Sequence, residues 1–174
     1  MEFIHSFSLP KNARIIDIGG GDSKLVDFLL EEGYKDITVL DISETATEHA
    51  KKRLGEKAAT VNWIVSDILD FKPVGKYDCW HDRATFHFLT SETDRLIYTG
   101  TARSSVAGYL IIGTFSDNGP EKCSGLVVKQ YSSEALTREF EQGFEKIKCI
   151  QDDHITPAGV VQHFTFCSFK KKNS

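Results

Sequence analysis

The chain has 174 residues, of which 40% are hydrophobic and 26% charged, a balance typical of a single soluble globular domain over residues 1–174. Its net charge of −4 supplies no basic field, and its one lysine run lies in a short tail, 170–174, so a nucleic-acid partner is disfavoured. No apolar run approaches about 18 residues and no secretory leader is present, so we expect no membrane association and a cytoplasmic location.

A buried strand, a glycine turn and a helix follow a short lead-in over residues 1–12. The strand, 13–18, is rich in isoleucine, as expected of a central parallel strand that is buried on both faces. Glycines 19–21 let the backbone turn sharply and let a ligand approach it. Apolar residues from Leu25 onward recur at helical spacing, so free N–H groups at the helix start point back at the turn. This arrangement predicts a nucleotide pocket.

The glycine turn lacks the dinucleotide-binding pattern G-x-G-x-x-G, because Lys24 stands where the third glycine is needed. Asp17 precedes the first glycine by two residues, and a carboxylate there favours an amine or a sulfonium over a pyrophosphate. The pattern Asp17-x-Gly19-x-Gly21 resembles the first motif of class I S-adenosylmethionine-dependent methyltransferases, with Ser23 in place of that family's usual third glycine. The resemblance implies S-adenosylmethionine as the cofactor. The residues that it implies for the methionine end are Asp17, Gly19, Gly20, Gly21 and Asp22.

Two further strands carry acidic residues at their ends. The strand 36–41 ends in Asp41, which is 20 residues past Gly21 and is placed to accept from both ribose hydroxyls. A serine-capped helix over 44–54 and a strand over 61–65 follow. By the same resemblance, Asp67 binds the adenine amine; its alternative role is an ordinary Asx turn. The two side chains expected to sandwich the adenine ring are Ile42 and Ile68.

The fourth strand, 77–81, runs into a dense polar segment. Residues just past a strand's carboxyl end face the ligand crevice of an open α/β sheet, so we expect this segment to face the acceptor. From Asp82 through His87 to Leu89 it resembles the D-x-x-x-x-H-x-L motif of small-substrate methyltransferases. His81 or His87 is a candidate general base, needed only if the nucleophile starts protonated. Asp82 is expected to orient a nitrogen acceptor and to contact the cofactor.

The rest of the chain continues the alternation of helix and strand. A helix capped by Ser91, a strand over 109–115 and a turn-rich loop over 116–125 are expected, and the loop is predicted to wall the acceptor site. A short helix, 132–141, precedes strands over 144–152 and 160–169, which are joined by a turn over 156–159.

The cysteines show no C-x-x-C spacing and are predicted to be reduced thiols rather than a disulfide framework or a zinc site. The turn over 156–159 makes Cys149 and Cys167 near cross-strand neighbours and brings His154 close to His163. Sheet pairing explains this proximity, so no metal site is predicted. Cys123 is predicted to be the cysteine most exposed at the acceptor loop.

The resemblance covers residues 13–169 and implies a three-layer, Rossmann-like α/β sandwich. Its sheet is expected to have seven strands, mostly parallel, in the order 3-2-1-4-5-7-6, with an antiparallel last strand. A closing antiparallel hairpin distinguishes this sheet from a dinucleotide-binding one.

The predicted activity is methyl transfer from S-adenosylmethionine to a small-molecule acceptor, with lysine on a partner protein as the next candidate acceptor. Two alternatives of other classes stay open. An NAD(P)-dependent oxidoreductase would fit Asp41, although the missing third glycine and Asp17 argue against it. A cofactor-binding module without catalysis is the other, because only a short segment precedes the first strand.

Overall fold

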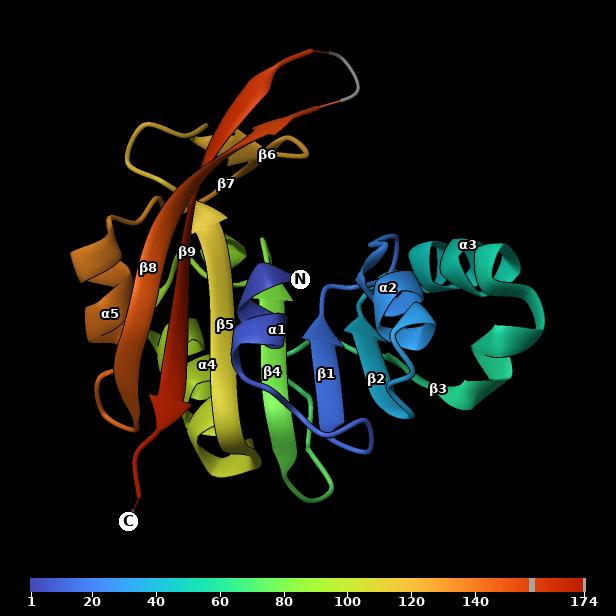
Figure 1. The fold of residues 1–174 in the computed structure, drawn as a ribbon. Helices are drawn as coiled ribbons and strands as arrows, with labels where there is room; N and C mark the ends of the chain where they lie inside the picture. The colour runs from blue at the N-terminus through green and yellow to red at the C-terminus, as the bar shows by residue number, and fades with distance from the viewer. Residues whose placement is uncertain (157–158, 174) are drawn as a thin grey trace.

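A computed structural model describes residues 1–156 and 159–173. Its centre is a seven-stranded sheet with the order β3-β2-β1-β4-β5-β9-β8 (Figure 1). The strands are β1 (Arg14–Ile18), β2 (Asp36–Asp41), β3 (Val61–Val65), β4 (Tyr77–Arg83), β5 (Val106–Phe115), β8 (Phe144–Ile155) and β9 (Val161–Lys171). The first five pair in parallel, whereas β9 is antiparallel to both β5 and β8. The predicted strand order and antiparallel last strand are confirmed.

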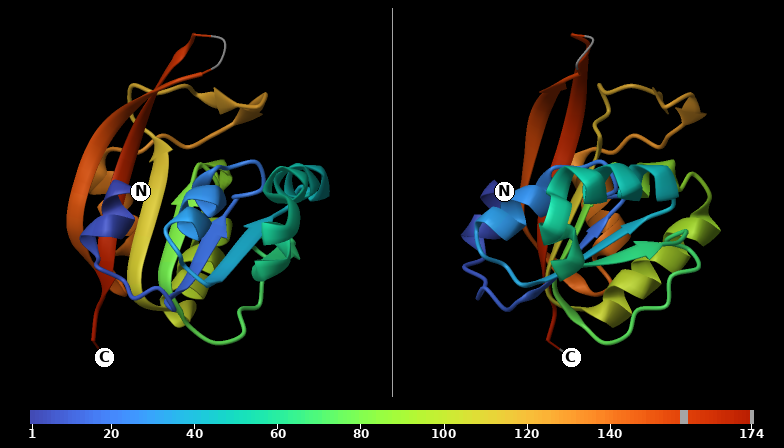
Figure 2. Two further views of the ribbon diagram at one scale, coloured as in Figure 1. Left: turned by 45° about the vertical axis from the view of Figure 1, so that its right-hand side comes forward. Right: turned by 90° about the vertical axis from the view of Figure 1, so that its right-hand side faces the viewer.

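Helices cover both faces of the sheet (Figure 2). They are α1 (Glu2–Ser6), α2 (Leu25–Glu31), α3 (Glu44–Leu54), α4 (Glu92–Ser105) and α5 (Ser133–Phe140), with 3-10 turns η1 (Gly55–Thr60) and η2 (Phe86–Phe88). Ile4 of α1 and Val26 of α2 belong to one buried apolar cluster, and Tyr98 of α4 and Leu136 of α5 belong to the other. The central strands are therefore buried on both sides, as their isoleucine content predicts. None of the helices in the described ranges is long and apolar enough to cross a membrane.

Three serines cap helices where the sequence predicts them. The Ser43 hydroxyl accepts from Ala46 N in α3, that of Ser91 from Asp94 N in α4, and that of Ser132 from Ala135 N in α5. Each side chain satisfies an N–H group that has no partner within its helix. These caps therefore fix the residues at which α3, α4 and α5 begin.

Several predicted boundaries differ from the structure. β4, predicted over 77–81, continues to Arg83, so Asp82 and Arg83 belong to the strand. β5 begins at Val106 rather than at residue 109, because the chain passes from α4 directly into the strand. The loop predicted over 116–125 contains a small hairpin, β6 (Lys122–Cys123) paired with β7 (Leu126–Val127). The turn predicted over 156–159 includes residues 157–158, which lie outside the described residues.

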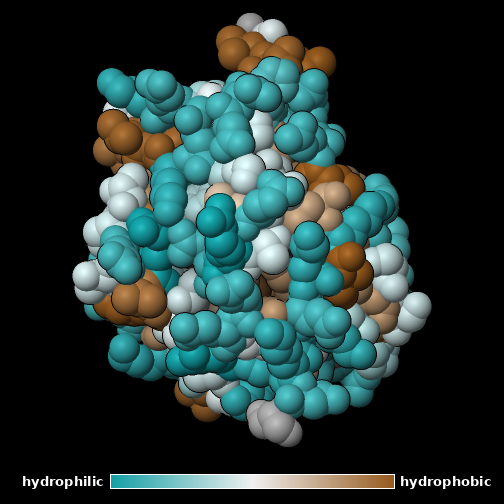
Figure 3. All heavy atoms as spheres, turned by 90° about the vertical axis from the view of Figure 1, so that its left-hand side faces the viewer, coloured by the Kyte–Doolittle hydropathy of each residue, from teal (hydrophilic) through white to brown (hydrophobic). Residues whose placement is uncertain are grey.

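The hairpin of β8 and β9 is longer than predicted and projects beyond the sheet at the edge where the parallel strands end (Figures 1 and 2). Its projecting end carries exposed apolar side chains, seen as the brown group at the top of Figure 3. Ile155 is 65% exposed and Val161 is 45% exposed. The base of the hairpin packs in the core through Cys167 and Phe169.

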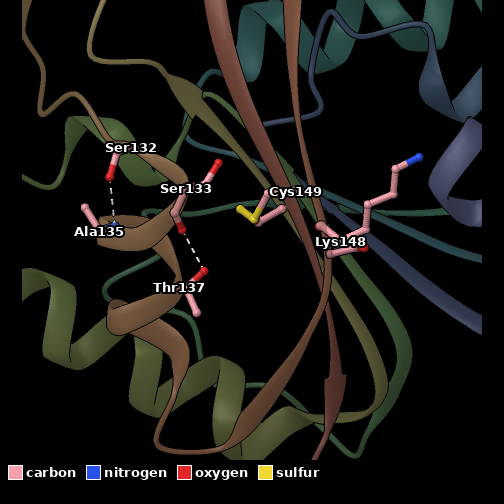
Figure 4. Close-up of a disulfide and its surroundings, with 8 residues drawn as sticks. Ser132, Ser133, Ala135, Thr137, Lys148 and Cys149 are labelled. Atoms are coloured by element: carbon pink, nitrogen blue, oxygen red, sulfur yellow. Dashed lines mark hydrogen bonds between the residues drawn. A yellow bond between two sulfur atoms is a disulfide. The ribbon is translucent and has the colours of Figure 1, made fainter.

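Cys149 and Cys167 form a disulfide, which corrects the prediction of reduced thiols. They are directly opposite in the β8–β9 ladder, with their Cα atoms 4.1 Å apart. The Cys149 side chain points toward α5, whereas that of Lys148 points away (Figure 4). The sequence predicts their cross-strand proximity; the error was to infer reduced thiols from the absence of C-x-x-C spacing, although cross-strand neighbours can bond without it. Cys79 and Cys123 are free thiols.

Reduction of this disulfide is expected to lower the free energy of unfolding by about 3 kcal/mol, because the bridge closes a short loop in the unfolded chain. Urea titrations with and without dithiothreitol measure the effect. A double variant with Cys149→Ala and Cys167→Ala is the control and should not respond to the reductant. Identical midpoints for the unmodified protein in both conditions would contradict a stabilising bridge.

Candidate functional site

Two adjoining cavities lie at the carboxyl ends of β1, β2, β3 and β4. The larger is about 700 Å³ and the smaller about 290 Å³. Gly19, Arg83, Ala84 and Cys123 line both, so the two cavities share these residues as a common wall. This is the edge at which open α/β sheets bind ligands.

Asp17 lies in the smaller cavity and is 1% exposed. The parallel register sets it opposite His81, on the face that α1 and α2 cover. Its Oδ1 is 2.7 Å from His81 Nδ1, and its Oδ2 is buried with no hydrogen-bond partner among the described residues. A buried carboxylate oxygen without a donor is costly. A ligand ammonium or sulfonium near Asp17 would therefore be stabilised.

The three-glycine turn packs too closely on two carboxylates to accommodate side chains. Gly19 has φ +68° and donates its N–H to Leu40 O at 2.7 Å. A Cβ on Gly20 would lie 2.3 Å from Asp17 Oδ2, and one on Gly21 would lie 2.8 Å from Asp41 Oδ2. Glycine is thus required by close approach at two successive positions.

Asp41 holds the turn and also lines the larger cavity. Its Oδ2 accepts from Gly21 N at 2.9 Å and its Oδ1 from Ser43 N at 2.7 Å. Each oxygen keeps further acceptor capacity, because a carboxylate oxygen has more than one lone pair. Asp41 is therefore both a structural link between β2 and the turn and an acceptor facing the cavity.

The adenine-binding candidates line the same cavity. Ile42 is 69% exposed, whereas Ile68 is buried. Asp67 Oδ1 accepts from Leu69 N at 2.9 Å, so the Asx turn considered for this residue is present. Asp22 lies outside both cavities: it is exposed, and its Oδ1 is 3.4 Å from Arg53 Nη1.

Residues 15–104 match a family model described as a methyltransferase domain. The chain belongs to this methyltransferase family. The predicted membership of the class I S-adenosylmethionine-dependent methyltransferases is confirmed, and the cofactor of that family is S-adenosylmethionine. The site fits that cofactor, because an unpartnered buried carboxylate and a side-chain-free turn lie at one end and Asp41 and Asp67 at the other.

Two curated proteins show partial similarity. The eEF1A lysine and N-terminal methyltransferase of Danio rerio is 27% identical over 112 residues, which are 63% of this chain and 16% of that protein. Malonyl-[acyl-carrier protein] O-methyltransferase 1 of Ilyobacter polytropus is 31% identical over 91 residues, which are 52% of this chain and 33% of that protein. The matched region therefore spans a third or less of each relative.

Solved structures share the fold of this methyltransferase at low identity. An S-adenosylmethionine-dependent methyltransferase from Methanosarcina mazei has a TM-score of 0.81 at 16% identity, covering 100% of this chain and 99% of that one. The N-methyltransferase NodS from Bradyrhizobium japonicum, in complex with S-adenosylhomocysteine, has a TM-score of 0.74 at 18% identity, covering 92% and 79%. At these low identities, both similarities show a shared fold and nothing about substrates.

The three catalytic candidates of this methyltransferase do not line either cavity. His81 and Asp82 are successive residues of β4, so their side chains point to opposite faces of the sheet. His81 lines a separate cavity beneath α1. His81 therefore reaches the smaller cavity only through its hydrogen bond with Asp17.

Asp82 is fully buried on the α4 side of the sheet. Its carboxylate accepts from Tyr98 Oη at 2.5 Å and from the backbone N–H groups of Thr85 and Phe86. Burial raises the pKa of Asp82 to about 6, against the lowering effect of these hydrogen bonds. The expected contact of Asp82 with acceptor or cofactor is thus replaced by a role in holding the turn after β4, because strand alternation points the carboxylate into the core.

His87 is also fully buried, which corrects the expectation that it faces the acceptor. Its Nδ1 accepts from Phe115 N at 3.3 Å, and its Nε2 has no partner among the described residues. Burial lowers the pKa of His87 to about 4, so the ring is neutral at pH 7. The short η2 turn sends this side chain inward, which motif spacing did not indicate.

The buried neutral imidazole of His87 is expected to make stability depend on acidity. Its folded-state pKa lies below its unfolded value of 6.5, so its contribution is present above about pH 6.5 and is lost as the pH falls toward 4. The loss is about 3 kcal/mol. Urea unfolding of wild type and His87→Asn from pH 7.5 to 4.5 isolates this effect, since other groups titrate equally in both. Parallel stability curves would contradict it.

The sequence motifs did not predict several residues that line the two cavities. The β6–β7 hairpin contributes Leu126 and Val127 to the larger cavity, and the β8–β9 hairpin contributes His154 and Gln162 to the smaller. The predicted loop does line the site, through Cys123. The sequence predicts the second hairpin itself, but not that its residues His154 and Gln162 line a cavity.

Proposed function

We propose that this methyltransferase transfers a methyl group to a small-molecule acceptor that enters the smaller cavity. The observation that carries the proposal is the buried, unpartnered Oδ2 of Asp17 where the glycine turn joins the two cavities. The bound cofactor supplies a methyl group on a sulfonium. The chain's residues align the reactants and exclude water, which are the main needs of an in-line displacement.

In this proposal each carboxylate has a separate task. Asp17, positioned by His81, pairs with the ammonium at the methionine end, and the backbone of Gly19, Gly20 and Gly21 provides close approach. Asp41 accepts from the ribose hydroxyls, and Asp67 with Ile42 and Ile68 encloses the adenine. No general base is assigned, because His81, Asp82 and His87 do not line the cavities.

Calorimetric titration with S-adenosylmethionine, S-adenosylhomocysteine and NAD tests the cofactor assignment. Micromolar binding of the first two without binding of NAD supports the proposal, whereas binding of NAD alone would favour an oxidoreductase. Methyl turnover on any acceptor would exclude a binding module without catalysis. Lysine on a partner protein stays the second acceptor candidate because of the similarity to the eEF1A methyltransferase. A cytoplasmic location is a prediction that the disulfide does not favour, because such bonds are typical of oxidising compartments.

Asp41→Ala is expected to weaken S-adenosylhomocysteine binding by about 1–3 kcal/mol, since a charged hydrogen-bond acceptor is lost. A modest loss of stability should accompany it, because Gly21 N and Ser43 N lose their acceptor. Calorimetry at a temperature where the variant is folded measures the affinity. Asp70→Ala, an exposed aspartate outside both cavities, is the matched control. Unchanged affinity in Asp41→Ala would remove this residue from the site.

A further inference from the structure

Arg83 is the positively charged residue at the junction of the two cavities. It is the last residue of β4, lines both cavities and is exposed. Among the described residues, no carboxylate oxygen lies within 4 Å of its guanidinium, whereas Arg53 and Arg95 each have such a partner. The charge of Arg83 is therefore available to a ligand.

Phe164 holds this guanidinium at the smaller cavity. The Arg83 Cζ atom is 5.3 Å from the Phe164 ring centroid, a cation–π geometry. Phe164 is itself buried and packs edge-on against Phe115, with centroids 4.9 Å apart. Both phenylalanines line the smaller cavity, so the cation lies beside an aromatic wall.

The charges of the two cavities differ. Asp41 and Asp67 line the larger cavity, where the cofactor's hydroxyls and amine need acceptors. The smaller cavity has one carboxylate, Asp17, which already faces His81. Its other polar side chains include His154 and Gln162, neither of which is anionic. In the proposed function the free Oδ2 of Asp17 pairs with the cofactor's ammonium, so the smaller cavity has no second carboxylate left to attract a cationic acceptor.

We propose that the acceptor carries a carboxylate or phosphate group that binds Arg83, joined to an apolar or aromatic body that packs on Phe164 and Phe115. This inference rests on the proposed methyltransferase function and narrows its acceptor. A planar guanidinium binds such anions through two parallel hydrogen bonds. A lysine ammonium would instead be repelled by Arg83, so the proposal separates an anionic small molecule from the protein-lysine alternative.

Three probes of similar size and different charge test the acceptor class: benzoate, phenyl phosphate and benzylamine. Each is titrated into protein saturated with S-adenosylhomocysteine at pH 7.5, and binding is followed by NMR chemical-shift changes. At least one anion should bind about tenfold more tightly than benzylamine, and the stronger of the two identifies the anion type. Tighter binding of benzylamine, or equal binding of all three probes, would overturn the proposal.

Arg83→Gln should reduce binding of the preferred anion by about tenfold or more, and Arg83→Lys should reduce it less, because lysine keeps the charge but not the planar fork. Arg138→Gln is the matched control. Arg138 is an exposed arginine on α5 that lines neither cavity, so its loss changes net charge equally without affecting the site. Equal anion affinity in Arg83→Gln and wild type would overturn the proposal.

A second comparison separates an acceptor anion from the cofactor's own carboxylate. S-adenosylhomocysteine and 5′-methylthioadenosine differ in that only the first carries the amino-acid group. Arg83→Gln should leave the affinity for both unchanged. A selective loss of S-adenosylhomocysteine binding would assign Arg83 to the cofactor and overturn the acceptor role. Absence of S-adenosylhomocysteine binding in wild type would be a failure of the proposed function itself, distinguishable from these outcomes.

Discussion

Gly20→Ala is expected to weaken S-adenosylhomocysteine binding by about 3 kcal/mol, roughly a hundredfold. The new Cβ would lie 2.3 Å from Asp17 Oδ2 and 2.7 Å from its Cγ. The carboxylate cannot move away easily, because Asp17 is buried on a central strand and hydrogen-bonded to His81. Displacing it removes the anion proposed to pair with the cofactor's ammonium. Calorimetry on the folded variant measures the loss.

Gly100→Ala is the matched control for this substitution. Gly100 lies within α4, and a Cβ there would meet no atom within 4 Å. Its replacement should leave cofactor affinity unchanged and raise the free energy of unfolding by up to about 1 kcal/mol, because alanine favours helix. If Gly20→Ala bound S-adenosylhomocysteine as tightly as Gly100→Ala does, Asp17 would not hold the cofactor in the proposed way.

Asp82→Ala is expected to lower the free energy of unfolding by about 4 kcal/mol, since two buried donors and one partly buried donor lose a charged acceptor. Those donors are Tyr98 Oη and the N–H groups of Thr85 and Phe86. The Trp80 indole also donates to Tyr98 Oη at 3.0 Å, so the hydrogen-bond chain extends into the core. Urea unfolding at pH 7 measures the change.

Two variants show whether this network or mere packing is responsible. Tyr98→Phe removes one donor and keeps the ring, so it should cost about 1–2 kcal/mol. Asp82→Asn keeps the shape and one acceptor oxygen and should cost less than Asp82→Ala. Equal stability of wild type and Asp82→Ala would show that the carboxylate does not hold the turn after β4.

Local sequence signals were sufficient for most of the fold. Isoleucine-rich strands, serine caps and the two-residue offset of Asp17 from Gly19 are all contained within short segments. The parallel register then places Asp17, the glycine turn and Asp41 at one edge without further information. Asp17, Gly19, Asp41 and Asp67 therefore line the cavities, whereas Asp22 and Asp82, also predicted to bind the cofactor, do not; the cofactor roles of these residues stay predictions.

The acceptor side depended on tertiary structure. Strand alternation and the η2 turn decide where His81, Asp82 and His87 point. His81 lies beneath α1, and Asp82 and His87 are buried. His154 and Gln162, which line the smaller cavity, belong to a hairpin more than 70 residues later in the chain than Arg83. Cross-strand register likewise decided that Cys149 and Cys167 bond.

The sequence by itself predicted the helix starts and the glycine turn, because each depends on residues close in the chain. The strand order was what the family resemblance implies, since β1 pairs with the distant strand β4. Only the tertiary structure decided the disulfide, the buried roles of Asp82 and His87, and the unpaired Arg83 beside Phe164. These features arise where distant segments meet, and side-chain direction there depends on packing that no short motif encodes.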